Sequence, residues 1–103
     1  MTHAEFEKLY AEVIHLEKEL LILKGAEYTK GSEDRLSNFK EIARELDTSP
    51  LHSWYVYFKK HVDSIASYIK NNGQVKSNEP IEGRFADARN YLALGLALIE
   101  DAK

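Results

Sequence analysis

The chain of 103 residues is 44% hydrophobic and 30% charged, carries a formal net charge of −3 and contains no cysteine. This length predicts one domain, residues 1–103, of ordinary globular composition, and the acidic balance argues against nucleic-acid binding, for which proteins present a basic face. The lack of cysteine excludes disulfides, thiolate nucleophiles and cysteine-ligated zinc, and the polar N-terminus and the absence of a membrane-length apolar run predict a cytoplasmic protein.

Residues 2–23 are expected to form the first helix. Thr2 and Glu5 have the spacing of a capping box, in which each side chain satisfies an amide of the first turn. Apolar residues then recur at alternating steps of three and four, which is the signature of one helical stripe. They are Phe6, Leu9, Val13, Leu16, Leu20 and Leu23. Gly25 follows this stripe, and we expect the helix to stop there.

A second helix is predicted over residues 32–47. Ser32 is placed to cap it, and its core face begins at Leu36 and Phe39. The stretch 24–40, which joins the first two helices, carries more charged and polar groups than a plain turn requires. We therefore interpret this stretch as one wall of a candidate site.

The third helix is expected over residues 50–71. Ser49 supplies a cap and Pro50 suits the first helical position. His61 falls on its inward face, in a stripe that also contains Tyr57 and Tyr68. These residues fit either a polar seam within the core or the side of a nucleotide pocket.

The fourth helix is expected over residues 79–101, and a projection at 100° per residue gives it two faces. One face is entirely apolar and is expected to be the core stripe: Ile81, Phe85, Ala88, Leu92, Leu96 and Ile99. The opposite face begins polar and becomes apolar: Glu79, Glu82, Asp87, Asn90, Leu94, Ala97 and Leu98. A helix that is apolar on nearly all sides lies at the centre of a fold or is covered by another subunit.

These elements predict an all-α fold, a four-helix bundle with helices at about 2–23, 32–47, 50–71 and 79–101. The apolar excess of the last helix predicts self-association, as a homodimer or a higher homo-oligomer.

Carboxylates on the fourth helix are the sharpest chemical feature. Glu79, Glu82 and Asp87 are candidate metal ligands, because oxygen donors suit magnesium, which keeps waters that can be exchanged for phosphate oxygens. The alternative is structural: Glu79 and Glu82 favour the helix N-terminus electrostatically, and Asp87 pairs with a neighbouring arginine. Asp87 and Asn90 stand on the line that continues as Leu94 and Leu98, where a carboxylate is costly unless it is paired or metal-bound.

Several short motifs together resemble a group of small phage-encoded proteins, which are similar to the nucleotide-modification-associated domain and, more distantly, to the MazG-like all-α nucleotide pyrophosphatases. The motifs are Lys24-Gly25-x-Glu27-Tyr28, Asp34-Arg35-Leu36-x-Asn38-Phe39, Lys60-His61 with Ile65, and Asp87-x-x-Asn90-Tyr91. The pyrophosphatase pattern has two acidic motifs on separate helices. Here Glu79-x-x-Glu82 lies just before Asp87, Asp87-x-x-Asn90 replaces the second motif, and Gly83 stands where related phage domains carry an acid.

The resemblance implies a nucleotide-binding protein, either a magnesium-dependent nucleoside triphosphate pyrophosphatase or a relative that binds without catalysis. It implies catalytic roles for Asp87, Glu82 and His61 and metal binding by Glu79, Glu82 and Asp87. The substrate would be bound by the remaining motif residues: Lys24, Glu27, Tyr28, Arg35, Asn38, Lys60, Asn90 and Tyr91.

The competing hypothesis is a non-enzymatic interaction protein. A small acidic phage protein of this size could bind and inhibit a host or defence protein through one helix face. In that case the polar groups of the third and fourth helices are core seams and ion pairs.

Overall fold

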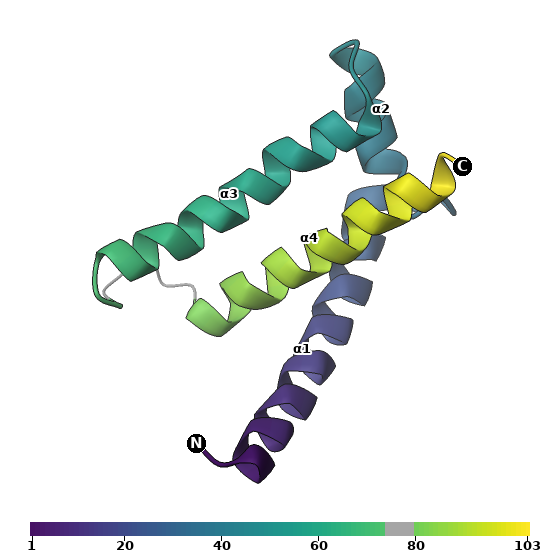
Figure 1. Ribbon diagram of the computed structural model, residues 1–103. Helices are drawn as coiled ribbons and strands as arrows, with labels where there is room; N and C mark the ends of the chain where they lie inside the picture. Colours follow the sequence, from purple (N-terminus) through teal and green to yellow (C-terminus); the bar gives the residue numbers. More distant parts are fainter. Residues whose placement is uncertain (74–79) are drawn as a thin grey trace.

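The computed structural model describes residues 1–73 and 80–103, and in these residues the chain is an all-α four-helix bundle (Figure 1). The helices are α1 (His3–Thr29), α2 (Ser37–Glu45), α3 (Pro50–Lys70) and α4 (Ile81–Asp101). α3 and α4 run side by side, α2 packs on α3, and α1 packs on α4. No helix in the described part of the chain is long and apolar enough to span a membrane. The predicted fold class is confirmed.

α1 does not stop at Gly25, and its predicted end was wrong. The helix continues to Thr29, whose hydroxyl donates to the Gly25 carbonyl at 2.8 Å, and it ends on Lys30 in the left-handed conformation. Gly31 follows with φ at +85°, so the second glycine, not the first, makes the turn. Gly25 lies within the helix because another side chain needs the space of its missing Cβ, as described below.

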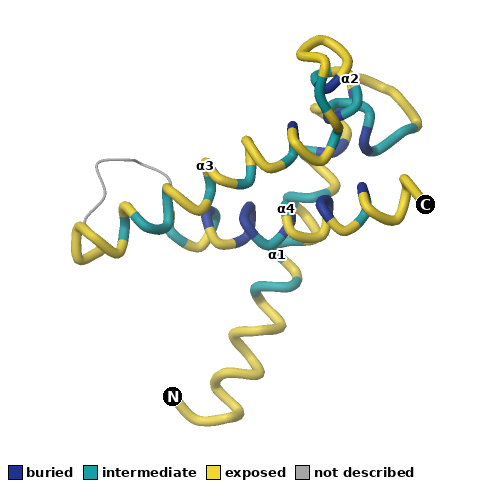
Figure 2. Tube along the Cα trace, turned by 45° about the horizontal axis from the view of Figure 1, so that its top comes forward, coloured by how far each residue is buried: buried dark blue, intermediate teal, exposed yellow. Residues whose placement is uncertain are grey.

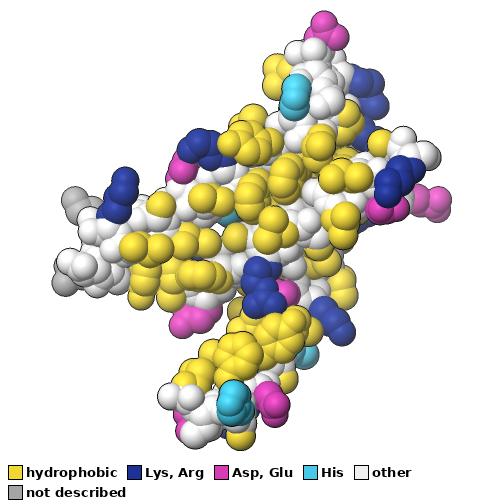
Figure 3. Space-filling view, in the orientation of Figure 1, with side chains coloured by type: hydrophobic (Ala, Val, Ile, Leu, Met, Phe, Trp, Pro, Cys, Tyr) yellow, Lys and Arg dark blue, Asp and Glu magenta, His cyan; other side chains and the backbone are white. Residues whose placement is uncertain are grey.

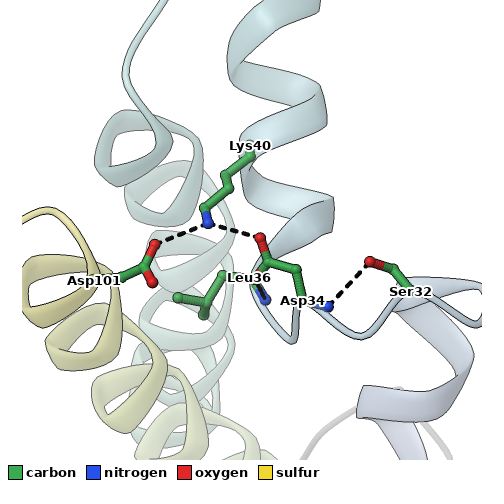
Figure 4. Close-up of polar contacts among 5 residues, drawn as sticks. All are labelled: Ser32, Asp34, Leu36, Lys40 and Asp101. Carbon is green, nitrogen blue, oxygen red and sulfur yellow. Dashed lines mark hydrogen bonds and ion pairs between the residues drawn. The ribbon is translucent and has the colours of Figure 1, made fainter.

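α2 begins at Ser37, five residues later than predicted. The Ser32 hydroxyl accepts from the amide of Asp34, and the Asp34 carboxylate accepts from the amide of Leu36, so these side chains stabilise a turn before the helix (Figure 4). Lys40 then joins two elements, with its ammonium 2.7 Å from Asp34 and 2.8 Å from Asp101 at the end of α4. The capping-type residues were recognised, but they act outside the helix.

α3 begins as predicted. Ser49 accepts from the amide of His52, and Pro50 occupies the first turn. The helix approaches α4 closely at Gly95, where a Cβ would lie only 2.6 Å from the Trp54 ring. The Trp54 indole also donates to the Tyr91 carbonyl. Gly95 and the Trp54 indole therefore set the distance between α3 and α4.

α4 is buried on the face that the sequence analysis did not choose. Phe85, Leu92, Leu96 and Ile99, expected in the core, are exposed by about half or more. The buried residues lie mainly on the side of the mixed face: Arg84, Ala86, Asp87, Asn90, Leu94, Gly95 and Leu98. Ala88 of the expected core stripe is buried as predicted. The reason is that this mixed face meets α1, α2 and α3, and its polar groups find partners there.

The core is small. Its buried apolar cluster consists of Leu36 and Phe39 from the α2 region and Leu94 and Leu98 from α4. The first part of α1 lies outside it: residues 1–12 are exposed, and they extend from the body as a separate arm (Figure 2). The predicted apolar stripe of the first helix therefore reaches the bundle only in its second half.

Candidate functional site

A groove of about 630 Å³ lies between the end of α1, α2 and α3. It gathers six residues that were predicted from the sequence as site residues: Glu27, Tyr28, Asn38, Lys60, His61 and Tyr91. These residues come from all four helices, so the bundle brings together positions that are up to sixty-four residues apart in the chain. Four residues of the stretch 24–40 line this groove, Glu27 and Tyr28 from the end of α1, then Lys30 and Asn38.

A second, much smaller cavity of about 20 Å³ lies behind the groove and has room for a single water. Its lining includes six predicted site residues, of which four do not line the groove: Lys24, Arg35, Asp87 and Asn90. Tyr28 and Tyr91 line both spaces. The predicted residues therefore form an open outer layer and a closed inner layer, with two tyrosines between them.

The inner layer contains a buried ion pair. The Lys24 ammonium lies 2.6 Å from the Asp87 carboxylate, and the side chains are 31% and 7% exposed. A carboxylate at this depth needs such a partner, because desolvation penalises an isolated charge by several kcal/mol. Asp87 thus points into the bundle, as its place on the Leu94 line predicts, and the residue that neutralises it is a lysine of α1.

Asn90 also ties α4 to α1. Its amide donates to the Glu17 carbonyl at 3.1 Å, and the neighbouring Arg89 pairs with the Glu17 carboxylate at 2.6 Å. Asn90 therefore holds the helices together below the groove.

Arg35 explains why residue 25 is a glycine. A Cβ at Gly25 would lie 2.5 Å from the Arg35 side chain, so the guanidinium rests directly against the backbone of α1. Nη1 of Arg35 is buried without a hydrogen-bond partner among the described residues, and the same holds for Oδ1 of Asn38. Two strong hydrogen-bonding atoms next to the site are thus unsatisfied within residues 1–73 and 80–103.

Aromatic rings surround the inner end of the groove. The Tyr91 ring lies 4.6 Å from His61 and 6.1 Å from Phe39, and Phe39 in turn meets Tyr57 edge-on at 6.4 Å. Burial raises the pKa of Tyr91 to about 12, and the nearby Tyr28, Tyr57 and Asp87 act in the same direction, against Arg35. Tyr91 is therefore a neutral hydrogen-bonding group throughout the physiological range.

The predicted metal ligands do not assemble in the described part of the chain. Glu79 lies outside the described residues, Glu82 is exposed in the first turn of α4, and Asp87 is buried against Lys24. No group of three histidine, aspartate or glutamate side chains within residues 1–73 and 80–103 is arranged to hold a metal. Asp87 and Glu82 therefore do not fit one resident magnesium site.

The groove itself has a different acidic group, which the sequence analysis missed. Glu41 and Glu45 line it from α2, together with Glu27 from α1, opposite the ammonium groups of Lys30 and Lys60. The available signal was the spacing of Asn38, Glu41 and Glu45 at steps of three and four, which places them on one face of α2.

Tyr57 lines the groove, whereas Tyr68 lies at the far end of α3, near Gly73. Of these two tyrosines, Tyr57 therefore belongs to the groove wall and Tyr68 does not.

Comparison of the chain with protein-family models, with curated proteins and with solved structures finds no match.

Proposed function

We propose that this chain binds a nucleotide in the groove between α1, α2 and α3. The observation that carries the proposal is the convergence of residues from four helices on one opening, where aromatic, amide and basic side chains stand together. Its volume of about 630 Å³ is in the range of small-molecule sites, which is roughly 300–1,000 Å³.

The inner end of the groove suits a base. Tyr28, Tyr57 and Tyr91 offer ring surfaces, and stacking on aromatic side chains is a recurrent way of holding nucleobases. Asn38 also lines the groove, and an amide side chain can pair with the donors and acceptors of a base. His61, beside Tyr91, adds a polar edge at the same end.

The outer part of the groove suits phosphates that carry a magnesium ion. Lys30 and Lys60 can neutralise phosphate oxygens, but three carboxylates line the same space and would repel a free triphosphate. Magnesium removes this conflict, because it is commonly held by one or two carboxylates together with the phosphates of the ligand. We therefore expect the nucleotide to bind as its magnesium complex, with Glu41 and Glu45 toward the metal.

The proposal concerns binding, and it changes the role expected of Asp87. Asp87 is buried and neutralised by Lys24, so it maintains the inner layer. If the bound nucleotide is also hydrolysed, as the resemblance to pyrophosphatases implies, the carboxylate that acts is one that reaches the groove. Glu41→Gln would then abolish pyrophosphate release, whereas Asp87→Asn would mainly lower stability.

Thermal melting with a panel of nucleoside triphosphates, with and without magnesium, tests the proposal. A ligand at a hundred times its Kd stabilises the native state by about 2.7 kcal/mol, which for a chain of this size raises Tm by roughly 10 °C or more. Lys60→Gln should reduce the shift, whereas Lys59→Gln, at the adjacent position outside the groove, should leave it unchanged.

A protein that melts cooperatively but shows no shift with any nucleotide would contradict the proposal. The interaction-protein hypothesis would then be the better account of this chain.

A further inference from the structure

The chain exposes far more surface than a compact monomer. Its accessible area is 7715 Å², whereas a folded monomer of 11.8 kDa exposes roughly 5,900 Å². Its radius of gyration is 15.5 Å, compared with about 13 Å for a compact domain of this length. The excess of roughly 1,800 Å² lies in the range that one partner contributes to an obligate homodimer, about 1,000–2,500 Å².

Part of this excess is an apolar line on the outer side of α4. Phe85, Leu92, Leu96 and Ile99 follow one another at steps of seven, four and three, so they lie on one line of the helix (the α4 stripe), with Arg89 at the position between Phe85 and Leu92. Apolar residues at such steps are typical of a seam against another helix. Within the described residues no helix covers this seam, because Leu94 and Leu98 on the opposite side face the bundle.

The α1 arm, residues 3–12, is the second uncovered element. Phe6, Leu9 and Tyr10 are about half exposed, and the rings of Phe6 and Tyr10 stack on each other. A helix segment of this length is marginal in water without tertiary contacts. Within one chain α1 reaches the line of the stripe at Arg89, which pairs with Glu17 and lies over the Tyr10 ring, whereas Phe85, Leu92, Leu96 and Ile99 stay about half exposed.

The arm and the stripe nevertheless present apolar side chains to the same side of the molecule. Figure 3 shows apolar atoms along the arm and across α3 and α4 on one face. The stripe ends at Ile99, which also lines a hollow of about 880 Å³ at the junction of α2, α3 and α4. One partner placed on this face would cover all of these surfaces at once.

We propose that the partner is a second copy of this chain, which covers the α4 stripe and the α1 arm in a two-fold homodimer. A two-fold interface requires one self-complementary face on each subunit, and the arm and the stripe supply a helix and a seam on the same face. The excess accessible area of roughly 1,800 Å² has the size that one subunit buries in such a dimer. The proposal does not depend on nucleotide binding, since the groove lies between α1, α2 and α3.

Sedimentation equilibrium tests the proposal directly. The wild type is expected at twice the 11.8-kDa chain mass, and Leu96→Glu is expected to sediment as a monomer. Leu46→Glu is the matched control, because Leu46 is similarly exposed but belongs to the end of α2 and lines neither the stripe nor the hollow. A monomeric wild type would overturn the proposal and leave the stripe to a partner of different sequence. A Leu96→Glu variant that is still dimeric would also overturn it.

A labelling experiment covers the case in which Leu96→Glu does not fold. The chain has no cysteine, so Leu96→Cys and Leu46→Cys each carry a single thiol. In one chain these positions are 61% and 70% exposed, and equal access predicts nearly equal rates with a maleimide. In the dimer, Cys at position 96 should react about tenfold more slowly, and the difference should disappear on dilution below the dissociation constant. Equal rates at high protein concentration would overturn the proposal.

Discussion

The two sides of α4 differ in a way that hydrophobicity alone does not explain. The buried side carries Asp87 and Asn90, and each of these has a partner on α1. The outer side carries Phe85, Leu92, Leu96 and Ile99, with Arg89 between them, and these apolar side chains are about half exposed within one chain. The buried face of a helix is therefore decided by which neighbours can satisfy its side chains, and the exposed stripe is the surface that we propose for a second copy of the chain.

The largest expected effect comes from breaking the ion pair on the inner side. Lys24→Met leaves the Asp87 carboxylate buried without a counter-ion, and we expect a loss of about 3 kcal/mol in the free energy of unfolding. This is the low end of the range for such pairs, because Lys24 is partly exposed. Urea denaturation at neutral pH measures the loss.

Two variants sharpen this result. Lys18→Met, at an exposed position of the same helix, should stay within about 0.5 kcal/mol of the wild type. Lys24→Met combined with Asp87→Leu removes both charges and should recover most of the loss. A single Lys24→Met variant as stable as the wild type would show that the pair does not hold α1 to α4.

The second effect concerns the close approach of α3. Gly95→Ala places a methyl group 2.6 Å from the Trp54 ring, which must shift, and overpacking of this kind costs about 1–3 kcal/mol. Ala93→Ser, on an exposed position of α4, is the control and should have little effect. Thermal unfolding of both variants provides the comparison, and a Gly95→Ala protein with unchanged Tm would mean that the helices are not in contact there.

The third effect is smaller. Asn90→Ala removes the hydrogen bond to the Glu17 carbonyl and should cost about 1 kcal/mol. Leu92→Gln, two positions further along but on the outer side, should leave the stability of the monomer nearly unchanged, because its side chain is already in water. If the outer substitution destabilised a monomeric form more than Asn90→Ala does, the assignment of the two sides would be wrong.

The smallest expected effect concerns the ionisation of Tyr91 at high pH. The pKa of Tyr91 is raised from 10.0 to about 12 by burial, so the folded state keeps this phenol neutral where the unfolded state ionises it. The stability that it contributes is present in full below pH 10 and is lost as the pH rises through the folded value of about 12. Tyr91→Phe should remove the last of the six tyrosines to ionise in an alkaline absorbance titration. A variant that keeps the highest-pH ionisation step and instead loses amplitude near the ordinary tyrosine pKa would show that Tyr91 is not the buried phenol.

Local sequence signals predicted the helices and part of the candidate site. The Ser49-Pro50 start and the inward direction of Asp87 and Asn90 followed from capping chemistry and helical spacing. The role of Gly25 did not follow from the sequence. A glycine that ends a helix and a glycine that makes room for an arginine side chain look alike in sequence.

Three features depend on how the helices pack. They are which side of α4 is buried, the pairing of Asp87 with Lys24, and the position of Glu41 in the groove wall. No local pattern contains that information. Of the residues that the predicted resemblance groups, six line the groove, and Lys24, Arg35, Asp87 and Asn90 line the inner cavity. The family and the function that it implies are still predictions.

Chemical-shift mapping by NMR, with a nucleoside triphosphate and magnesium added to the isotopically labelled protein, tests the central proposal most directly. The proposal predicts perturbations at Tyr28, Asn38 and His61 in the groove, and none at Leu92 and Leu96 on the outer side of α4. Perturbations confined to the outer side, or none with any nucleotide, would contradict it.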